Sequence, residues 1–168
     1  MPYMAINLGG VAIGVGIVVV FLIRWHLREK RRFGALVPFV LSLLYGMLLA
    51  LAALGAWSLL GMTTWVALWA GNVAGYVGLV FGVGGTAPDV TRAQQLALTP
   101  GGYVIVFLIT IALAAFLYWG PRTSTLKIVF GCLAGILMAL SGNVAGVAAI
   151  PLGSGVNLAG SAFTGVFG

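Results

Sequence analysis

Residues that could carry out chemistry are few in this chain. His26 is the single histidine and Cys132 the single cysteine, and they lie far apart in the sequence. A metal site or a cysteine–histidine nucleophile needs such side chains in groups, and an internal disulfide needs a second cysteine. The glycines of Gly153-Ser-Gly155 have neither the lysine nor the strand of a phosphate-binding loop. We therefore expect no enzyme, no cofactor and no metal site.

Two asparagines and the absence of charge characterise the apolar segments. No acidic or basic side chain lies within a segment long enough to cross a membrane, which argues against ion-coupled transport. Asn72 and Asn143 are the notable polar side chains inside these segments. One interpretation is a hydrogen bond between helices, worth about 1 kcal/mol or less. The other is that Asn72 and Asn143 line a pore.

The composition excludes a water-soluble monomer. Hydrophobic residues make up 62% of the 168 positions, and 26 further positions are glycine. Charged residues make up 6%, whereas soluble domains carry about 25%. Eight basic and two acidic side chains cannot cover a soluble particle of this size, and its exposed apolar surface would drive aggregation. The chain is therefore expected to be an integral membrane protein.

Five apolar segments approach the length of about 17–25 residues that a helix needs to cross a bilayer. Backbone groups in hydrocarbon must be satisfied within the segment, and the alternation of a membrane β-strand is missing, so we expect helices. The predicted fold is one all-α membrane domain over residues 1–168, a transmembrane helical bundle with spans at about 5–23, 36–60, 65–83, 103–119 and 128–150, a loop at 84–102 and a glycine-rich tail at 152–168.

A basic cluster follows the first segment and predicts the orientation. Its members are Arg24, Arg28, Lys30, Arg31 and Arg32. Short loops rich in Lys and Arg stay in the cytoplasm, so we expect a cell-membrane protein with its N-terminus outside. The cluster is expected to set topology and to contact anionic lipid headgroups, at about 1 kcal/mol per cation. The alternative is a positive ring, formed by several subunits, that meets an anionic partner such as nucleic acid.

Charge and hydropathy favour different numbers of spans. With five spans, Arg92 joins the basic cluster inside, while Arg122 and Lys127 lie outside. If 65–83 is re-entrant and returns to the side it came from, Arg122 and Lys127 are inside and Arg92 alone is outside. Because 65–83 is apolar enough to cross, we predict five spans, with four spans plus a re-entrant segment as the alternative.

Glycines spaced by four residues are the most specific pattern. This spacing puts both glycines on one face of a helix, where another backbone can approach closely, and such packing drives helix association in lipid. The predicted helix-packing pairs are Gly10/Gly14, Gly71/Gly75, Gly78/Gly82, Gly131/Gly135 and Gly142/Gly146. We expect a homo-oligomer, although the pattern does not decide whether the pairs pack within or between subunits.

Three further features concern the connections and possible repeats. The pentapeptide Gly71-Asn-Val-Ala-Gly75 recurs at Gly142–Gly146, which suggests duplicated helical hairpins at about 36–83 and 103–150. Pro88 and Asp89 are expected to open a short helix in the loop, where Asp89 can pair with Arg92. Pro151 is expected to end the fifth helix, and the tail to pack on the membrane face or on a neighbouring subunit.

The layout resembles that of small multi-pass proteins of actinobacterial mobile elements. The likeness is carried by Arg24–Arg32, by the stretch Thr91-Arg-Ala-Gln-Gln-Leu-Ala-Leu-Thr-Pro-Gly-Gly102 and by the glycine pairs. In that group, plasmid-spread proteins are thought to help DNA pass between cells. The resemblance implies a role in conjugation and no particular functional residue.

These observations lead to one expected function and two alternatives. We expect a non-enzymatic subunit of an oligomeric, channel-like or scaffolding membrane assembly that serves macromolecule or DNA transfer. A passive small-solute transporter is one alternative, and an accessory subunit of a larger membrane complex is the other. The expected partners are anionic membrane lipids and further copies of the chain, while direct contact with nucleic acid stays open.

Overall fold

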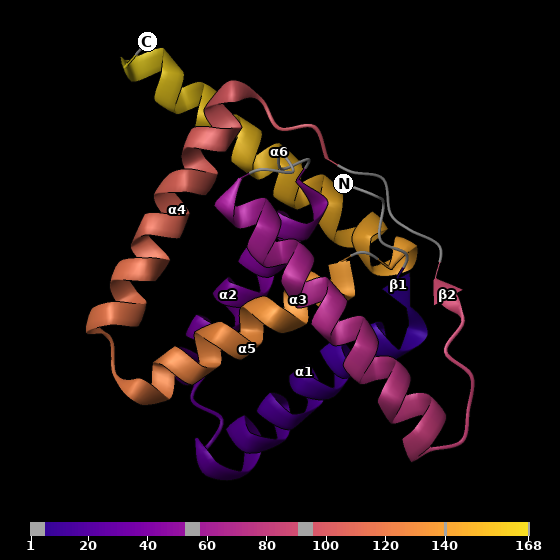
Figure 1. Ribbon diagram of the computed structural model, residues 1–168. Coiled ribbons are helices and arrows are strands. Elements are labelled where there is room, and N and C mark those ends of the chain that lie inside the picture. The colour runs from indigo at the N-terminus through magenta and orange to yellow at the C-terminus, as the bar shows by residue number, and fades with distance from the viewer. Residues whose placement is uncertain (1–5, 53–57, 91–95, 140, 168) are drawn as a thin grey trace.

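The computed structural model describes residues 6–52, 58–90, 96–139 and 141–167 (Figure 1). Over these residues the fold is all-helical, as predicted. The helices are α1 (Leu8–Arg28), α2 (Phe33–Leu51), α3 (Leu59–Tyr76), α4 (Pro100–Trp119), α5 (Arg122–Ala139) and α6 (Gly142–Phe167). The π-helical turn η1 (Val77–Gly82) continues α3, and the short strands β1 (Ile6–Asn7) and β2 (Asp89–Val90) pair in antiparallel orientation.

Short polar side chains begin three of the helices. Asn7, Ser58 and Thr99 occupy the N-caps of α1, α3 and α4, and each side-chain oxygen accepts a hydrogen bond from the backbone N–H three residues later. These caps satisfy one of the N–H groups that the first turn of a helix leaves without a partner. Pro100 opens α4, where its missing N–H costs no helical hydrogen bond.

Four helices, α1, α2, α4 and α5, form a bundle. Glu29, just after α1, forms an ion pair with Lys127 near the start of α5, and Lys127 also donates to the carbonyl of Ala35 near the start of α2. Leu51 at the end of α2 packs in one cluster with Ala139 at the end of α5. Therefore α2 and α5 run parallel, and α1 and α4 run the opposite way. We call the end with Glu29 and Lys127 the basic end, and the opposite end the far end.

Helix α3 lies across the far end of the bundle. Its Leu68 packs in the same cluster as Leu51, the last residue of α2. One turn later Asn72 is hydrogen-bonded to Asn7, at the start of α1. Figure 1 shows α3 crossing the direction of the bundle helices. Together, α3 and η1 are long and apolar enough to span a membrane. However, α3 contacts the end of α2 and the start of α1, which both lie at the far end of the bundle.

Helix α6 also lies across the far end, over the other half of the bundle. Val156 packs with Ala52, directly after α2, and Asn157 bonds to Thr99 at the start of α4. Figure 1 shows α6 running from the neighbourhood of β1 to the start of α4. The far end is therefore covered by two helices that are not parallel to the bundle.

The described residues on both sides of 91–95 contact the far end. The Leu8 N–H donates to the carbonyl of Pro88, and the Leu96 N–H donates to the carbonyl of Leu51. Pro88 therefore lies at the start of α1, and Leu96 lies at the end of α2.

The order of two bundle helices and one crossing helix occurs twice, in α1–α3 and in α4–α6. Contacts between the halves are reciprocal: a Cβ on Gly46 would meet the Cys132 carbonyl, and a Cβ on Gly135 would meet the Leu43 carbonyl. Cys132 and Gly135 are separated by as many residues as Leu43 and Gly46. Reciprocal contacts of this kind indicate a local two-fold axis that runs between the parallel helices α2 and α5. The outer helices do not follow it equally, because α1 packs closely along α5 whereas α4 lies farther from α2.

The outer surface of the bundle is apolar. α1, α2, α3 with η1, and α4 are long and apolar enough to cross a membrane, and Ser124–Ala139 forms a shorter apolar helix. Large side chains such as Val20, Leu27, Phe107 and Trp119 are exposed. Contiguous apolar surface of this extent is costly in water. The fold is therefore compatible with a membrane protein.

Several predicted boundaries are wrong. Segment 128–150 is two helices, because α5 ends at Ala139 and α6 begins at Gly142. Most of the predicted tail belongs to α6, and Pro151 lies inside this helix instead of ending a span. Its ring is exposed, so only one surface hydrogen bond of the helix is lost. Likewise, α1 continues to Arg28, because long cationic side chains can extend into water while the backbone stays helical.

The predictions for the loop and the repeat need correction as well. Asp89 lies in strand β2, not in a helix, because its backbone pairs with β1, and its predicted partner Arg92 lies outside the described residues. Five spans and duplicated hairpins at 36–83 and 103–150 are not confirmed. The segments that correspond are α1–α3 and α4–α6, so the structural counterpart of Asn72 is Asn157, because both bond to the start of a bundle helix.

Candidate functional site

Small residues let α2 and α5 touch along their backbones. A Cβ on Gly131 would lie 2.6 Å from the Phe39 carbonyl and would also overlap the hydroxyl of Ser42. Ser42 is fully buried, and its hydroxyl donates to the same carbonyl over 2.9 Å. Ser42 and Gly46 are four residues apart, as are Gly131 and Gly135, so each helix presents a small face to the other. This parallel contact joins the two halves of the chain.

A second close contact joins α1 to α3. The Asn7 N–H donates to Oδ1 of Asn72 over 3.2 Å, and the Asn7 side-chain amide donates to the Asn72 carbonyl over 3.0 Å. Gly9 and Gly75 meet so closely that a Cβ on either would overlap the backbone of the other. Asn7 also accepts the cap hydrogen bond from Gly10 over 2.8 Å. The start of α1 is thus fixed to α3 by hydrogen bonds and backbone contact.

The contact between α4 and α6 has the same design. Oδ1 of Asn157 accepts from the Thr99 N–H over 3.0 Å and from the Thr99 hydroxyl over 3.2 Å. A Cβ on Gly101 would lie 2.6 Å from the Gly160 carbonyl. Thr99 accepts the cap hydrogen bond from Gly102 over 3.1 Å. Asparagine and glycine therefore fix both crossing helices to the starts of bundle helices.

The predicted packing glycines have different surroundings. Six of them are buried against another helix: Gly10, Gly14, Gly71, Gly75, Gly131 and Gly135. Gly78 and Gly82 lie in η1, where nothing is found within 4 Å of a Cβ built on either. Gly142 and Gly146 lie in α6, and their surroundings fall outside the described residues. Packing within the chain thus uses three of the pairs and leaves the pair in η1 open.

The two predicted polar residues also differ. Asn72 forms hydrogen bonds between helices, which is the interpretation that needs no pore. Asn143 lies in the first turn of α6, and its surroundings fall outside the described residues. The sequence analysis missed Asn157 and Thr99. The spacing of Asn157-Leu-Ala-Gly160, which repeats that of Asn72-Val-Ala-Gly75, was the signal that could have found Asn157.

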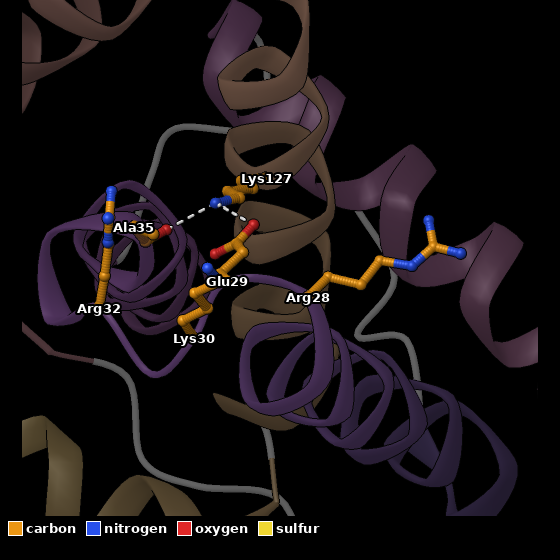
Figure 2. Close-up of a pocket in the computed structure, with 6 residues that line it drawn as sticks. All are labelled: Arg28, Glu29, Lys30, Arg32, Ala35 and Lys127. Atoms are coloured by element: carbon orange, nitrogen blue, oxygen red, sulfur yellow. Dashed lines mark hydrogen bonds and ion pairs between the residues drawn. The ribbon is translucent and has the colours of Figure 1, made fainter.

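An ion pair connects the α1–α2 turn to α5 at the basic end (Figure 2). Nζ of Lys127 lies 2.7 Å from Oε1 of Glu29 and donates over 2.7 Å to the Ala35 carbonyl. The two side chains are only 12% and 20% exposed, so solvent screens their attraction less than at an open surface. The cations at this end whose side chains are described are Arg24, Arg28, Lys30, Arg31, Arg32 and Lys127. Arg122 is the first residue of α5, and Arg92 lies outside the described residues.

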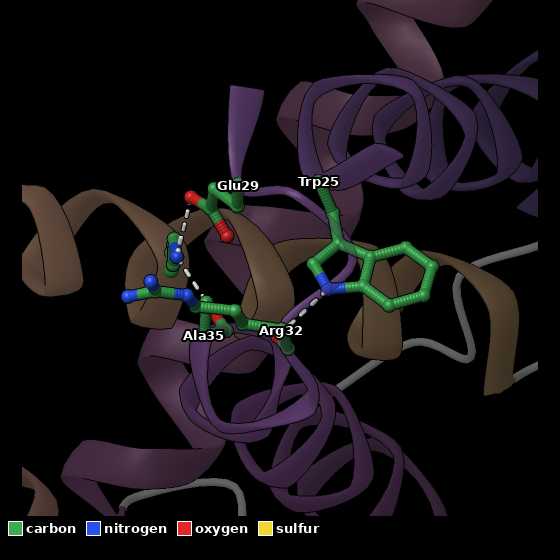
Figure 3. Close-up of polar contacts among 5 residues, drawn as sticks. Trp25, Glu29, Arg32 and Ala35 are labelled. Carbon is green, nitrogen blue, oxygen red and sulfur yellow. Dashed lines mark hydrogen bonds and ion pairs between the residues drawn. The ribbon is translucent and has the colours of Figure 1, made fainter. Parts of the chain in front are cut away.

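The α1–α2 turn has an unusual backbone. Lys30 and Arg31 adopt φ angles of 48° and 58°, in the left-handed region that costs residues other than glycine about 1–2 kcal/mol each. Two contacts hold the turn. The Trp25 indole N–H donates to the Arg32 carbonyl over 2.9 Å (Figure 3), and Nη2 of Arg31 donates to Nε2 of His26 over 3.0 Å.

A hollow opens beside the ion pair (Figure 2). It has a volume of about 480 Å³ and is lined by Arg28, Glu29, Lys30, Arg32, Ala35 and Lys127. Arg28, Lys30 and Arg32 are exposed, and their side chains form no hydrogen bond or ion pair with other described residues. Because Glu29 is engaged by Lys127, the hollow has an excess of positive charge, which suits an anion.

The described residues contain no group of three or more His, Cys, Asp or Glu side chains that could hold a metal ion. Comparisons with protein-family models, with curated proteins and with solved structures find no match to this chain. The resemblance to proteins of mobile elements therefore stays a prediction.

Proposed function

We propose that the chain crosses the membrane four times, through α1, α2, α4 and α5, with the basic end in the cytoplasm. The main support is that seven of the eight Lys and Arg residues of the chain belong to this end. Lysine and arginine accumulate in cytoplasmic loops, so the contact of the α1–α2 turn with α5 favours four spans over five. The start of α1 is then outside.

The far end fits this orientation. Non-helical backbone is not tolerated where lipid surrounds it, because its polar groups stay unsatisfied. The extended connection around β2 bonds to the start of α1 and the end of α2, so it need not enter the hydrocarbon. In this arrangement α3 and α6 lie in the outer part of the membrane, and Trp65, Trp69 and Tyr76 on α3 are exposed there. Tryptophan and tyrosine favour such interfaces.

Site-directed labelling tests the orientation. In a Cys132→Ser background, single cysteines at Asp89 and at Ser124 are treated in intact cells with a membrane-impermeant maleimide. Four spans place Asp89 outside and Ser124 inside, whereas five spans reverse both. A cysteine at Lys30 is the control, because both topologies place it inside. Labelling of Ser124→Cys with protection of Asp89→Cys would contradict the proposal.

We further propose that the protein is a non-enzymatic subunit of an oligomeric membrane assembly, channel-like or scaffolding. The observation that carries this proposal is the open glycine pair Gly78 and Gly82 in η1. Of the four pairs whose surroundings are described, three already pack inside the chain, and Gly78 and Gly82 are free to pack against a neighbour. A role in the transfer of DNA or another macromolecule follows from the resemblance and from the excess of cations at the basic end.

The mass of the particle in mild detergent tests the assembly. We expect a mass of several chains for the unmodified protein, and a smaller mass for Gly78→Leu and Gly82→Leu, because leucine blocks backbone approach. Gly16→Leu is the matched control, since this position on α1 also has nothing within 4 Å. A monomeric unmodified protein, or equal masses for all variants, would contradict the proposal.

The matched halves favour a second candidate, a passive small-solute transporter. Parallel repeats related by an axis along the membrane normal occur in transporters. The axis between α2 and α5 has this direction in the proposed orientation. Uptake of small neutral solutes by proteoliposomes containing the monomer would support the transporter, and the same assay without uptake would support an assembly or an accessory subunit.

A further inference from the structure

We propose that the hollow at the basic end binds the phosphate group of an acidic membrane lipid. Three cations line it without a described partner, and the only carboxylate in its lining, that of Glu29, is held by Lys127. The inference rests on the proposed cytoplasmic position of this end. Beyond the orientation, the inference names a ligand for the basic end and the residues that bind this ligand.

Around the hollow, the negative charge of Glu29 lies apart from the cations that have no partner among the described residues. Figure 2 shows Glu29 directed toward Lys127, with Lys30 and Arg32 on one side of this pair and Arg28 on the other. Arginine and lysine bind phosphate oxygens through charge-assisted hydrogen bonds. A phosphate in the hollow would meet Lys30 and Arg32, while the Glu29 carboxylate stays neutralised by its ion pair.

The strained turn gives Lys30 its position. Left-handed residues other than glycine persist only where their surroundings fix them, and they concentrate at functional sites. Here two follow one another, and the Trp25–Arg32 hydrogen bond closes the turn. Lys30 lines the hollow, whereas Arg31 contacts His26 away from it. Lys30 is therefore available to a ligand in the hollow, whereas its neighbour Arg31 is not part of the lining.

Apolar side chains beside the turn favour a lipid over a soluble phosphate compound. Leu27 precedes Arg28 and is 73% exposed, and Phe33 follows Arg32 and is 78% exposed. A lipid brings its phosphate and its hydrocarbon to adjacent positions, so it can contact the cations and these side chains together. Nucleic acid would use the cations and leave the apolar side chains in water.

Native mass spectrometry of the protein in a neutral detergent tests the site. With added phosphatidylglycerol we expect one retained lipid per chain, and with phosphatidylcholine none. The double variant Lys30→Gln/Arg32→Gln should weaken binding about 25-fold, at about fivefold per cation. The control Arg24→Gln removes one cation from the same segment outside the hollow and leaves the contacts of the turn in place, so it should change binding less than about twofold. A loss of about fivefold for Arg24→Gln, as large as the loss per cation in the double variant, would show diffuse attraction and overturn the proposal.

Lys30→Gly provides a second variant should the double variant not fold. Glycine keeps the left-handed backbone and removes only the cation, so about a fivefold loss is expected. Unchanged lipid binding by this variant would also contradict the site.

Competition identifies the source of the phosphate. Millimolar inorganic phosphate, or a short single-stranded oligonucleotide, is added to the complex with phosphatidylglycerol. Retention of the lipid supports the proposal, whereas displacement by either competitor means that a soluble phosphate compound or nucleic acid is the ligand. The labelling of Asp89→Cys and Ser124→Cys is measured separately. Loss of lipid binding with the expected labelling refutes the site alone, and reversed labelling refutes the orientation.

Discussion

Replacing Gly75 by alanine probes the contact between α1 and α3. The Cβ of an alanine at this position would overlap the backbone of Gly9 and lie next to the N–H of Gly10. A flexible side chain could rotate away from such a methyl group, but the backbone of α1 cannot. The start of α1 must therefore move away from α3, and this strains the hydrogen bonds between Asn7 and Asn72.

The expected loss of stability follows from two opposing contributions. Overpacking costs typically 1–3 kcal/mol, and because the obstacle is backbone we take the upper value, about 3 kcal/mol. Alanine has a higher helix propensity than glycine by about 1 kcal/mol, which offsets part of this cost. Gly75→Ala should therefore lower the free energy of unfolding by about 2 kcal/mol.

The assay is unfolding in detergent micelles by titration with sodium dodecyl sulfate. Gly16→Ala is the control, because a Cβ at this position on α1 meets nothing and Gly16 belongs to no proposed interface, so it should leave the stability unchanged or raise it by up to about 1 kcal/mol. The matched variant in the second half is Gly160→Ala, whose Cβ would overlap the backbone of Gly101 and Gly102. A Gly75→Ala protein as stable as the Gly16→Ala protein would refute the close contact.

Three further predictions use the same titration. Asn157→Leu removes the acceptor of two hydrogen bonds from Thr99, each worth about 0.6 kcal/mol, so the stability should fall by about 1 kcal/mol; an unchanged midpoint would contradict the contact. Lys127→Met leaves the carboxylate of Glu29 without its partner and should cost about 1.5–3 kcal/mol, whereas a stabilised variant would show that the pair is not formed. Lys30→Gly removes the steric cost of a left-handed backbone at a residue with a Cβ and should stabilise the protein by about 1 kcal/mol; a destabilised variant would contradict the left-handed conformation of Lys30.

The helices were predictable because their apolar segments are long and free of charge. The sequence correctly indicated helices at α1, α2, α3 and α4, although several ends were misplaced. The break between α5 and α6 was missed, because apolar residues on both sides of it led us to read Ser141, Gly142 and Asn143 as part of one span. A change of direction depends on what the next helix packs against, and hydropathy along the chain does not contain this information.

The candidate sites were predictable in type but not in partner. Spacing by four residues identified Gly131 and Gly135 as a small face, and Ser42 and Gly46 form the face that they contact. The matching pentapeptide was less informative, because a short match of Gly, Ala and Val arises easily in such a composition. The structural equivalent of Asn72 is recognised only through its hydrogen bond to the start of a bundle helix.

The amino-acid sequence by itself determined that most of this chain is apolar enough to lie in hydrocarbon and that the cations gather near a few turns. These properties follow from composition and local order. Only the tertiary structure decided that α2 and α5 run parallel, that α3 and α6 cross the far end, and that Lys127 reaches Glu29. The physical reason is that a glycine face allows any helix backbone to approach closely. Which helix actually packs there depends on how all the helices of the chain pack together.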